Sequence, residues 1–504
     1  MLEIPSLESL NIGAALPAII VAAWACVLLL IDFAIPKHRK HVTAWLAAAC
    51  LVVAFVANLL VYNQTGDSFL GMYVADQFTG FLNLVVLATA FITIMLSIDY
   101  IRRVEIERGE YYVLLLFVTA GAMFMVAAND LIMIFVALEL LSIPLYVLAA
   151  FRAPDLRSEE AGLKYFLLGA FASAFFVFGA AMVYGATGTT NLNEIYHSVA
   201  AVTAANDSLQ YFLVLGAGLL IVGLGFKVAA APFHEWTPDV YEGAPTPITA
   251  FMSVAAKIGG FGALLRILIV GMSSLTFVQG DPALWQNVIA LIAALTVIIG
   301  NVVAVAQNNV KRLLAYSSIA NAGYVMMAVA AAGTPGVENQ AARAALIYLV
   351  AYMFTNLGAF AVVIGLERVK GSSDLEDFVG LGKSRPALAA MMAVFMLSLT
   401  GVPLTSGFIG KAFVFSATLN AGLVWLAIIG VITSVISAYY YIRIIVNMYL
   451  RDDETPSDDP TPGYTPNVHW ATAIAFGGTI LIGVLPILIT GLTDNVALVA
   501  AVIP

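Results

Sequence analysis

Long apolar runs alternate along the chain with short polar segments. The runs lie near residues 13–35, 42–62, 78–99, 112–128, 131–151, 163–185, 211–233, 247–270, 284–306, 313–333, 343–366, 387–419, 422–447 and 470–492. A helix of about 20 apolar residues spans the hydrocarbon core of a bilayer, and backbone in lipid must satisfy its hydrogen bonds internally. The alternating pattern of an outer-membrane barrel is absent from the sequence. The pattern predicts an all-α polytopic membrane protein with about 14 transmembrane helices.

Composition supports this class and narrows the chemistry. Hydrophobic residues make up 62% of the 504 residues and charged residues only 11%, against about 25% charged in soluble domains. Two cysteines, Cys26 and Cys50, are too few for an iron–sulfur cluster and have no metal-finger spacing. The sequence has no dinucleotide-binding fingerprint, no P-loop and no helix-spaced histidine pair. We therefore expect no cofactor and no metal in this chain itself. The net charge of -9 is carried mainly by loops such as 452–460 and says little about nucleic acid; we expect no nucleic-acid partner.

Basic residues predict the orientation of the spans. Most of the 22 Lys and Arg residues fall in alternate loops, at Lys37, Arg39, Lys40, Arg102, Arg103, Arg108, Arg152, Arg157, Lys311, Arg312, Arg368, Lys370, Lys383, Arg385 and Arg451. Loops rich in Lys and Arg face the cytoplasm, so both termini are expected outside. Residues 1–12 contain two glutamates and no basic residue, unlike a signal peptide, and we expect the first apolar run to be a retained helix. Arg266, Arg343 and Arg443 lie near span ends, where long side chains reach the interface.

Four charged residues lie well inside apolar spans. Lys257 and Glu139 are ten and eight residues into theirs, which places Lys257 about 15 Å deep at helical rise. Lys227 and Lys411 lie in spans interrupted by glycine and proline. A charge at the bilayer centre costs at least about 2.5–3.5 kcal/mol, and a lysine between burial and a carboxylate can load and release a proton near neutral pH. The four residues together predict a proton relay, although any one of them taken singly could equally be a packing device.

Two further residues are weaker candidates. Lys164 lies one residue inside its predicted span, so its position leaves burial and the interface both open. His234 follows Lys227 by seven residues and would share its helix face if Pro232 left the helix intact. The reading of His234 as an interfacial histidine is favoured slightly.

The breaks also predict an internal repeat. Span seven has Gly223, Gly225 and Pro232 around Lys227, and span twelve has a similar cluster before Lys411. Broken helices in two separated segments are typical of transporters with inverted repeats. We expect three N-terminal helices in 1–110, a first five-helix repeat in 111–272, an inverted second in 284–448, an acidic Pro-rich cytoplasmic loop in 449–469 and a last helix in 470–504.

Four stretches carry a resemblance to a known family. They are FRAPDLRSEEAGLKYFLLGAFASAFFVFGAAMVYGATGTTNL (151–192), GFKVAAAPFHEWTPDVYEGAPTPITAFMSVAAKIGGFGALLRI (225–267), NVVAVAQNNVKRLLAYSSIANAGYVMMA (301–328) and SLTGVPLTSGFIGKAFVF (398–415). The chain resembles the antiporter-like subunit N, or subunit 2, of proton-pumping NADH:quinone oxidoreductase (respiratory complex I), from about residue 75 to 450. The resemblance implies that Glu139 pairs with and tunes Lys227, that Lys257 is central, and that Lys411 lies beside the outward exit. Lys164 matches a lysine of the family's sixth helix.

The resemblance also implies partners and a location. Other membrane-arm subunits, among them an adjacent antiporter-like subunit and small membrane subunits, would bind this chain together with lipid. NADH, FMN, iron–sulfur clusters and quinone would be bound by partner subunits. The bacterial inner membrane is favoured over a plastid or thylakoid membrane. Two alternatives remain open: an Mrp-type cation/proton antiporter subunit, which shares the same lysines, and a non-pumping scaffold of the membrane arm.

Overall fold

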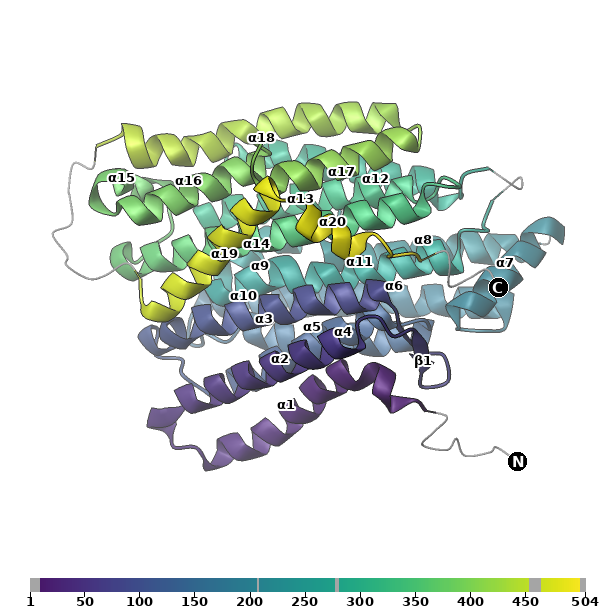
Figure 1. The fold of residues 1–504 in the computed structure, drawn as a ribbon, viewed down its shortest axis with the longest axis horizontal. Helices are drawn as coiled ribbons and strands as arrows, with labels where there is room; N and C mark the ends of the chain where they lie inside the picture. The colour runs from purple at the N-terminus through teal and green to yellow at the C-terminus, as the bar shows by residue number, and fades with distance from the viewer. Residues whose placement is uncertain (1–9, 206–207, 277–280, 453–463, 499–504) are drawn as a thin grey trace.

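The computed structural model describes residues 10–205, 208–276, 281–452 and 464–498. Within these ranges, 13 helices are long and apolar enough to cross a membrane, and a shorter apolar helix, α16 (Pro386–Thr400), is followed by α17 (Ser406–Asn420). The helices run side by side in one bundle (Figure 1). The predicted all-α polytopic class is confirmed, and α16 with α17 forms predicted span twelve as a broken helix.

The first half of the chain begins with two helices at the edge of the bundle and ends in its centre. Its helices are α1 (Leu16–Ala34), α2 (His41–Val61), α3 (Gln77–Arg103), α4 (Glu110–Ala127), α5 (Leu131–Ala149), α6 (Leu156–Thr187), α7 (Leu192–Ala205), α8 (Gln210–Val228), α9 (Trp236–Gly243), α10 (Thr246–Phe251) and α11 (Lys257–Leu265). Between and after the last two lie π-helical segments η3 (Met252–Ala256) and η4 (Arg266–Gly271). A small antiparallel hairpin, β1 (Gly66–Ser68) and β2 (Tyr73–Ala75), connects α2 to α3.

The second half contributes the remaining helices. They are α12 (Trp285–Ala304), α13 (Val310–Ala331), α14 (Glu338–Lys370), α15 (Leu381–Ser384), α16, α17, α18 (Val424–Leu450), α19 (Pro466–Val484) and α20 (Ile487–Thr493). Short 3-10 turns lie at Ile12–Ala15, Lys37–Arg39 and Leu375–Phe378. Of the acidic loop predicted at 449–469, residues 453–463 lie outside the described ranges. The division into two inverted repeats stays a prediction.

Local sequence explains where many helices begin. Asp76, Asp130, Asp155, Asn309 and Thr465 each precede a helix, and each side chain accepts a hydrogen bond from a backbone N–H of the first turn. Short polar side chains at this position satisfy donors that have no partner within the helix. These caps fix where α3, α5, α6, α13 and α19 enter the membrane region.

The breaks differ in one respect from the sequence prediction. Span seven was predicted to run over 211–233, but α8 ends at Val228, because Ala229 adopts a left-handed conformation with φ 60°. The chain resumes as α9 only at Trp236. Lys227 therefore lies in the last turn of α8, next to the break, and not in the middle of a continuous helix.

Burial identifies the interior of the bundle. The apolar windows of the span 246–271, of α13 and of α14 are 100%, 94% and 94% buried, whereas that of α6 is 28% buried. The first three elements pass through the centre of Figure 1, and α1 and α18 lie at opposite edges. Polar side chains on the three central helices are therefore shielded from lipid on every side.

Arg266 corrects a second expectation. Its position near a span end predicted a side chain that reaches the interface, yet it is 1% exposed. The guanidinium pairs with Asp76 at 2.9 Å, donates to the carbonyl of Val126 at 2.6 Å and lies over the ring of Phe78. Arg266 thus joins the end of the central span to the start of α3.

Candidate functional site

Lys227 lies in a polar pocket formed by three helices. Its ammonium group donates to Ser142 Oγ of α5 at 2.9 Å and to Tyr165 Oη of α6 at 3.2 Å, and its side chain is 2% exposed. The ring of Tyr165 in turn stacks on Trp236 at the start of α9, with centroids 4.4 Å apart. Trp236, beyond the break in span seven, is therefore connected to the Lys227 amino group through the ring of Tyr165.

Glu139 lies one turn before Ser142 on α5, but its carboxylate is engaged elsewhere. It accepts a hydrogen bond of 2.5 Å from Ser173 Oγ on α6. The direct ion pair between Glu139 and Lys227 implied by the family resemblance is not formed in this structure, because Lys227 is held by neutral hydroxyl groups. Glu139 and Ser142, the hydroxyl partner of Lys227, lie one turn apart on α5. The Glu139 and Lys227 side chains can therefore each change conformation without breaking an ion pair between them.

Lys257 lies at the start of α11 in the centre of the bundle. It is 2% exposed and donates to the main-chain carbonyl of Ser318 on α13. The π-helical segment Met252–Ala256 directly precedes it, and single π turns within helices occur frequently at functional sites. Lys257 therefore links the first half of the chain to α13, the second helix of the other half.

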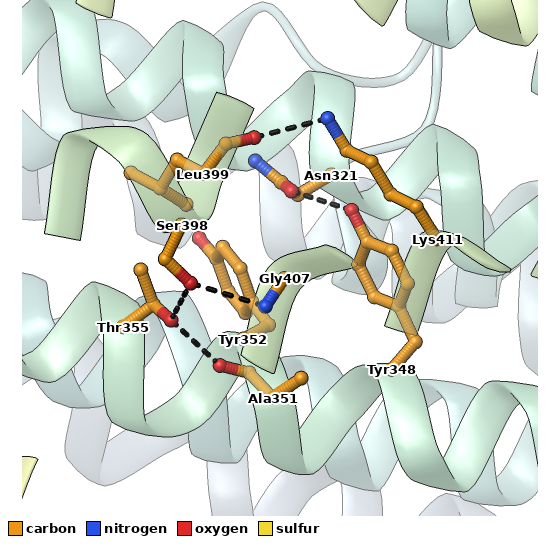
Figure 2. A pocket seen from close by; sticks show the side chains of 9 residues that line it. All are labelled: Asn321, Tyr348, Ala351, Tyr352, Thr355, Ser398, Leu399, Gly407 and Lys411. Atoms are coloured by element: carbon orange, nitrogen blue, oxygen red, sulfur yellow. Dashed lines mark hydrogen bonds between the residues drawn. The ribbon is translucent and has the colours of Figure 1, made fainter. Parts of the chain in front are cut away.

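Lys411 lies at the second break. Its ammonium donates to the carbonyls of Leu399 and Thr400 at 3.0 and 2.8 Å and to Ser434 Oγ at 2.8 Å. The last carbonyls of a helix have no partner within it, so the end of α16 supplies acceptors of partial negative charge. Figure 2 shows this contact beside a small cavity that Lys411 and Tyr352 help to line. The cavity leaves ≈ 10 Å³ for the centre of a water molecule, about the space that one water needs.

Lys164 belongs to a different cluster from Lys227, Lys257 and Lys411. Its side chain is 41% exposed and pairs with Asp239 at 2.7 Å and Glu160 at 2.5 Å. Arg312 also pairs with Asp239, at 2.8 Å. Burial alone would raise the pKa of the Asp239 carboxyl, but the hydrogen bonds from Lys164 and Arg312 outweigh it and hold that pKa below its usual value. A polar recess of ≈ 230 Å³ is lined by Lys164, Glu160 and Asp239 together with Glu242 and Arg157.

His234 lies in the connection between α8 and α9, half-buried, and not on a continuous helix face with Lys227. Its Nδ1 atom is buried without a hydrogen-bond partner among the described residues. The shared helix face proposed from the seven-residue spacing is wrong, because the helix stops at Val228 before Pro232 is reached.

The site also contains neutral hydroxyl and amide side chains, which a search of the sequence for buried charged residues did not identify. Asn321 of α13 accepts a hydrogen bond of 2.6 Å from Tyr348 of α14, and both line the cavity beside Lys411. Ser318 and Tyr352 lie in the same interior. The signal available in the sequence is polar residues one turn apart in an otherwise apolar span, as in 317–324 and at Tyr348 and Tyr352.

The arrangement has one chemical consequence. In the part of the chain that the structure describes, Lys227, Lys257 and Lys411 form no ion pair with a carboxylate; each is held by hydroxyl or carbonyl oxygens. Neutral oxygens can hold an amine as well as an ammonium ion, whereas a carboxylate would favour the charged form. The interior can therefore hold lysines in either protonation state.

Two broken helices with buried lysines, inside a helical bundle that spans a membrane, define an antiporter-like membrane subunit. Residues 128–437 match the model of the family described as NADH:quinone oxidoreductase/Mrp antiporter, TM. The chain belongs to this family and, within it, to the subunit N group of NADH-quinone oxidoreductases.

The similarity to known members extends over nearly the whole chain. It is 45% identical to NADH-quinone oxidoreductase subunit N 2 of Roseiflexus castenholzii, covering 95% of both chains. A chain of respiratory complex I from Thermus thermophilus is 35% identical with a TM-score of 0.78, covering 94% of this chain and 98% of that one. A chain of the Mrp complex from Dietzia, 21% identical, has the same fold with a TM-score of 0.80, covering 96% of this chain and 97% of that one.

Proposed function

We propose that this chain translocates protons as subunit N in the membrane arm of an NADH:quinone oxidoreductase. The observation that carries the proposal is that Lys227, Lys257 and Lys411 are each at most 5% exposed and are held by hydroxyl or carbonyl oxygens, without a carboxylate ion pair among the described residues. A scaffold has no need for three uncompensated amino groups, because each buried charge costs several kcal/mol by rough estimate. A group that exchanges a proton does need them.

The relay would run from the first break to the second. Helices α8 and α11 pack closely: a Cβ atom at Gly260, one turn after Lys257, would lie 3.6 Å from the Lys227 side chain. Lys257 then contacts α13, which carries Asn321 of the Lys411 cavity. In this proposal a change near Glu139 shifts the proton affinity of Lys227, its proton moves through Lys257 to Lys411, and Lys411 releases it outward. Lys227 is refilled from the cytoplasmic side.

The energy would come from partner subunits. These would bind NADH, FMN, iron–sulfur clusters and quinone, and within the described ranges no cluster of three or more His, Cys, Asp or Glu residues could hold a metal ion. The distribution of basic loops supports an arrangement in the bacterial inner membrane with both termini outside. An adjacent antiporter-like subunit, small membrane subunits and lipid would cover the exposed apolar faces of helices such as α6.

Alanine substitution of the first lysine and the glutamate tests the relay. In membrane vesicles containing the assembled complex, Lys227→Ala and Glu139→Ala should depress proton pumping and quinone reduction. The NADH-oxidising part, assayed with a water-soluble electron acceptor, should stay active. Lys37→Ala, at an exposed lysine, is the matched control. Wild-type pumping in both Lys227→Ala and Glu139→Ala would show that these residues carry no proton.

Purification of the native assembly tests the choice of complex. Extraction in a mild detergent should recover flavin and iron–sulfur proteins together with this chain. Recovery with only other antiporter-like membrane subunits would favour an Mrp-type antiporter instead. The fold alone is shared with the Mrp complex, and the 45% identity to a subunit N favours the oxidoreductase.

A further inference from the structure

Several polar atoms in the centre of the bundle are buried without a protein partner. Among the described residues they include the hydroxyl oxygens of Ser318, Tyr241 and Tyr352 and the amide oxygen of Asn356. All four residues are at most 6% exposed. Buried polar groups in proteins nearly always bond to protein or to ordered water. Their concentration around Lys257 points to a ligand that can both donate and accept hydrogen bonds.

The geometry suits water as that ligand. The Ser318 hydroxyl on α13 faces the phenols of Tyr241 on α9 and Tyr352 on α14, and Ser253 of the π-helical segment also faces Tyr352. The hydroxyls of Ser318, Tyr241 and Tyr352 nevertheless form no well-aligned hydrogen bond with any described residue. A bridging water can connect polar groups that do not bond directly. The carbonyl of the same Ser318 accepts a hydrogen bond from Lys257, so the amino group lies beside these hydroxyl groups.

Tyr352 also lies next to the second break. It lines the cavity beside Lys411, and in Figure 2 it lies between Ser398 and Tyr348. Tyr348, one turn earlier on α14, lines the same cavity, but its phenol is committed to Asn321 Oδ1 at 2.6 Å. Of these two phenols, Tyr352 is the one whose hydroxyl has no protein acceptor.

We propose that the Tyr352 hydroxyl passes protons, through bound water, between Lys257 and the cavity beside Lys411. The proposal rests on the relay described above and names a residue for the transfer from Lys257 to Lys411. Lys257 loses one proton and becomes an amine. At each oxygen on the way one O–H bond forms as another breaks, so the phenol and the waters end neutral. Lys411, as an amine, gains the proton and becomes an ammonium ion.

Two substitutions remove the hydroxyl groups and keep the packing. Tyr352→Phe keeps the ring, and Ser318→Ala keeps the carbonyl that holds Lys257. Each should lower proton pumping per quinone reduced by about fivefold, the factor that corresponds to one net hydrogen bond. Each should also raise the solvent deuterium isotope effect on pumping, and the double variant should lose little more than either single one, because both act on one path.

The matched control is Tyr111→Phe. Tyr111 of α4 is also a fully buried phenol, but its hydroxyl bonds to Ser97 Oγ at 2.8 Å on the neighbouring helix. We expect this variant to pump normally with an unchanged isotope effect. All variants are measured in the assembled complex, and pumping is normalised to the amount of complex.

The outcomes separate the two proposals. If Lys257→Ala and Lys411→Ala abolish pumping while Tyr352→Phe and Ser318→Ala pump normally, the lysine relay stands and the role of Tyr352 is wrong. If Tyr352→Phe lowers only the amount of complex, the phenol merely packs, and the inference is again wrong. If the lysine variants also pump normally, the proposed function itself is refuted.

Discussion

Substitution of Lys411 by arginine separates a mobile proton from a fixed positive charge. The ammonium holds the free end of α16 through the carbonyls of Leu399 and Thr400, and it also bonds to Ser434. A guanidinium group has enough donors for the same oxygens, yet it does not give up its proton in proteins. Lys411→Arg should therefore keep the break intact and stop proton release.

The magnitude follows from the contacts. Lys411→Met removes all donors at similar volume and leaves the buried carbonyl of Leu399 without this partner, at about 1–3 kcal/mol. The Thr400 carbonyl keeps a hydrogen bond of 3.3 Å from Ser434 Oγ, and removal of a buried charge offsets part of the cost. Lys411→Arg keeps these bonds and adds volume beside the cavity of ≈ 10 Å³, at a packing cost of about 1–3 kcal/mol. Both variants should lose pumping, and the arginine variant should assemble in near wild-type amounts.

The assay is fluorescence quenching by a pH-sensitive acridine dye in inverted vesicles, with quinone reduction measured in parallel. Thermal inactivation of the purified complex reports stability. Pumping by Lys411→Arg at the wild-type rate would refute the reasoning, because a residue that cannot release its proton would then suffice at this position.

Three further predictions concern the break, the buried arginine and the surface cluster. Gly407→Ala would place a Cβ 1.9 Å from the carbonyl oxygen of Ser398, so the break must shift, and the Tm of the complex and its pumping should both fall; an unchanged Tm would contradict this close approach. Arg266→Met leaves the carboxylate of Asp76, whose side chain is 16% exposed, without its cation. The cost should lie below the roughly 3–5 kcal/mol of a fully buried pair and is measured as loss of assembled complex, with Arg108→Met at an exposed position as control. The pKa of Asp239 is lowered in the folded protein, so its contribution to stability is complete above its unfolded pKa and is lost as the pH falls through its folded pKa. Asp239→Asn should therefore reduce the fall in Tm at acid pH. An unaltered pH profile of the Tm would show that the cluster contributes nothing to stability.

Hydropathy was enough to predict the crossings because lipid leaves the backbone few choices. A segment that cannot bond to solvent must be helical, and its length is set by the bilayer. The predicted spans at 42–62 and 131–151 accordingly match α2 and α5 to within two residues at either end. Sequence also predicted the interruptions in spans seven and twelve, since glycine and proline weaken a helix at their own positions.

Elements that depend on distant partners were not foreseen. The hairpin β1–β2 and helices α7 and α9 are short, and their stability comes from packing against other parts of the chain. Arg266 was expected at the interface because its place in the span is near one end, and only the tertiary structure brings Asp76 and Phe78 around it.

The candidate site divides in the same way. A lysine in an apolar run is visible in sequence because its burial is costly wherever it packs, so Lys227, Lys257 and Lys411 could be singled out from the sequence alone. Whether such a group meets a carboxylate, a helix end or a hydroxyl depends on residues far away in the chain. The tertiary structure decided that Lys164 joins a surface cluster, that Lys227 bonds to Ser142 and Tyr165, and that Lys257 meets Ser318. The free-energy cost of burying a charge depends on the residue itself, whereas its hydrogen-bond and ion-pair partners depend on how the whole bundle packs.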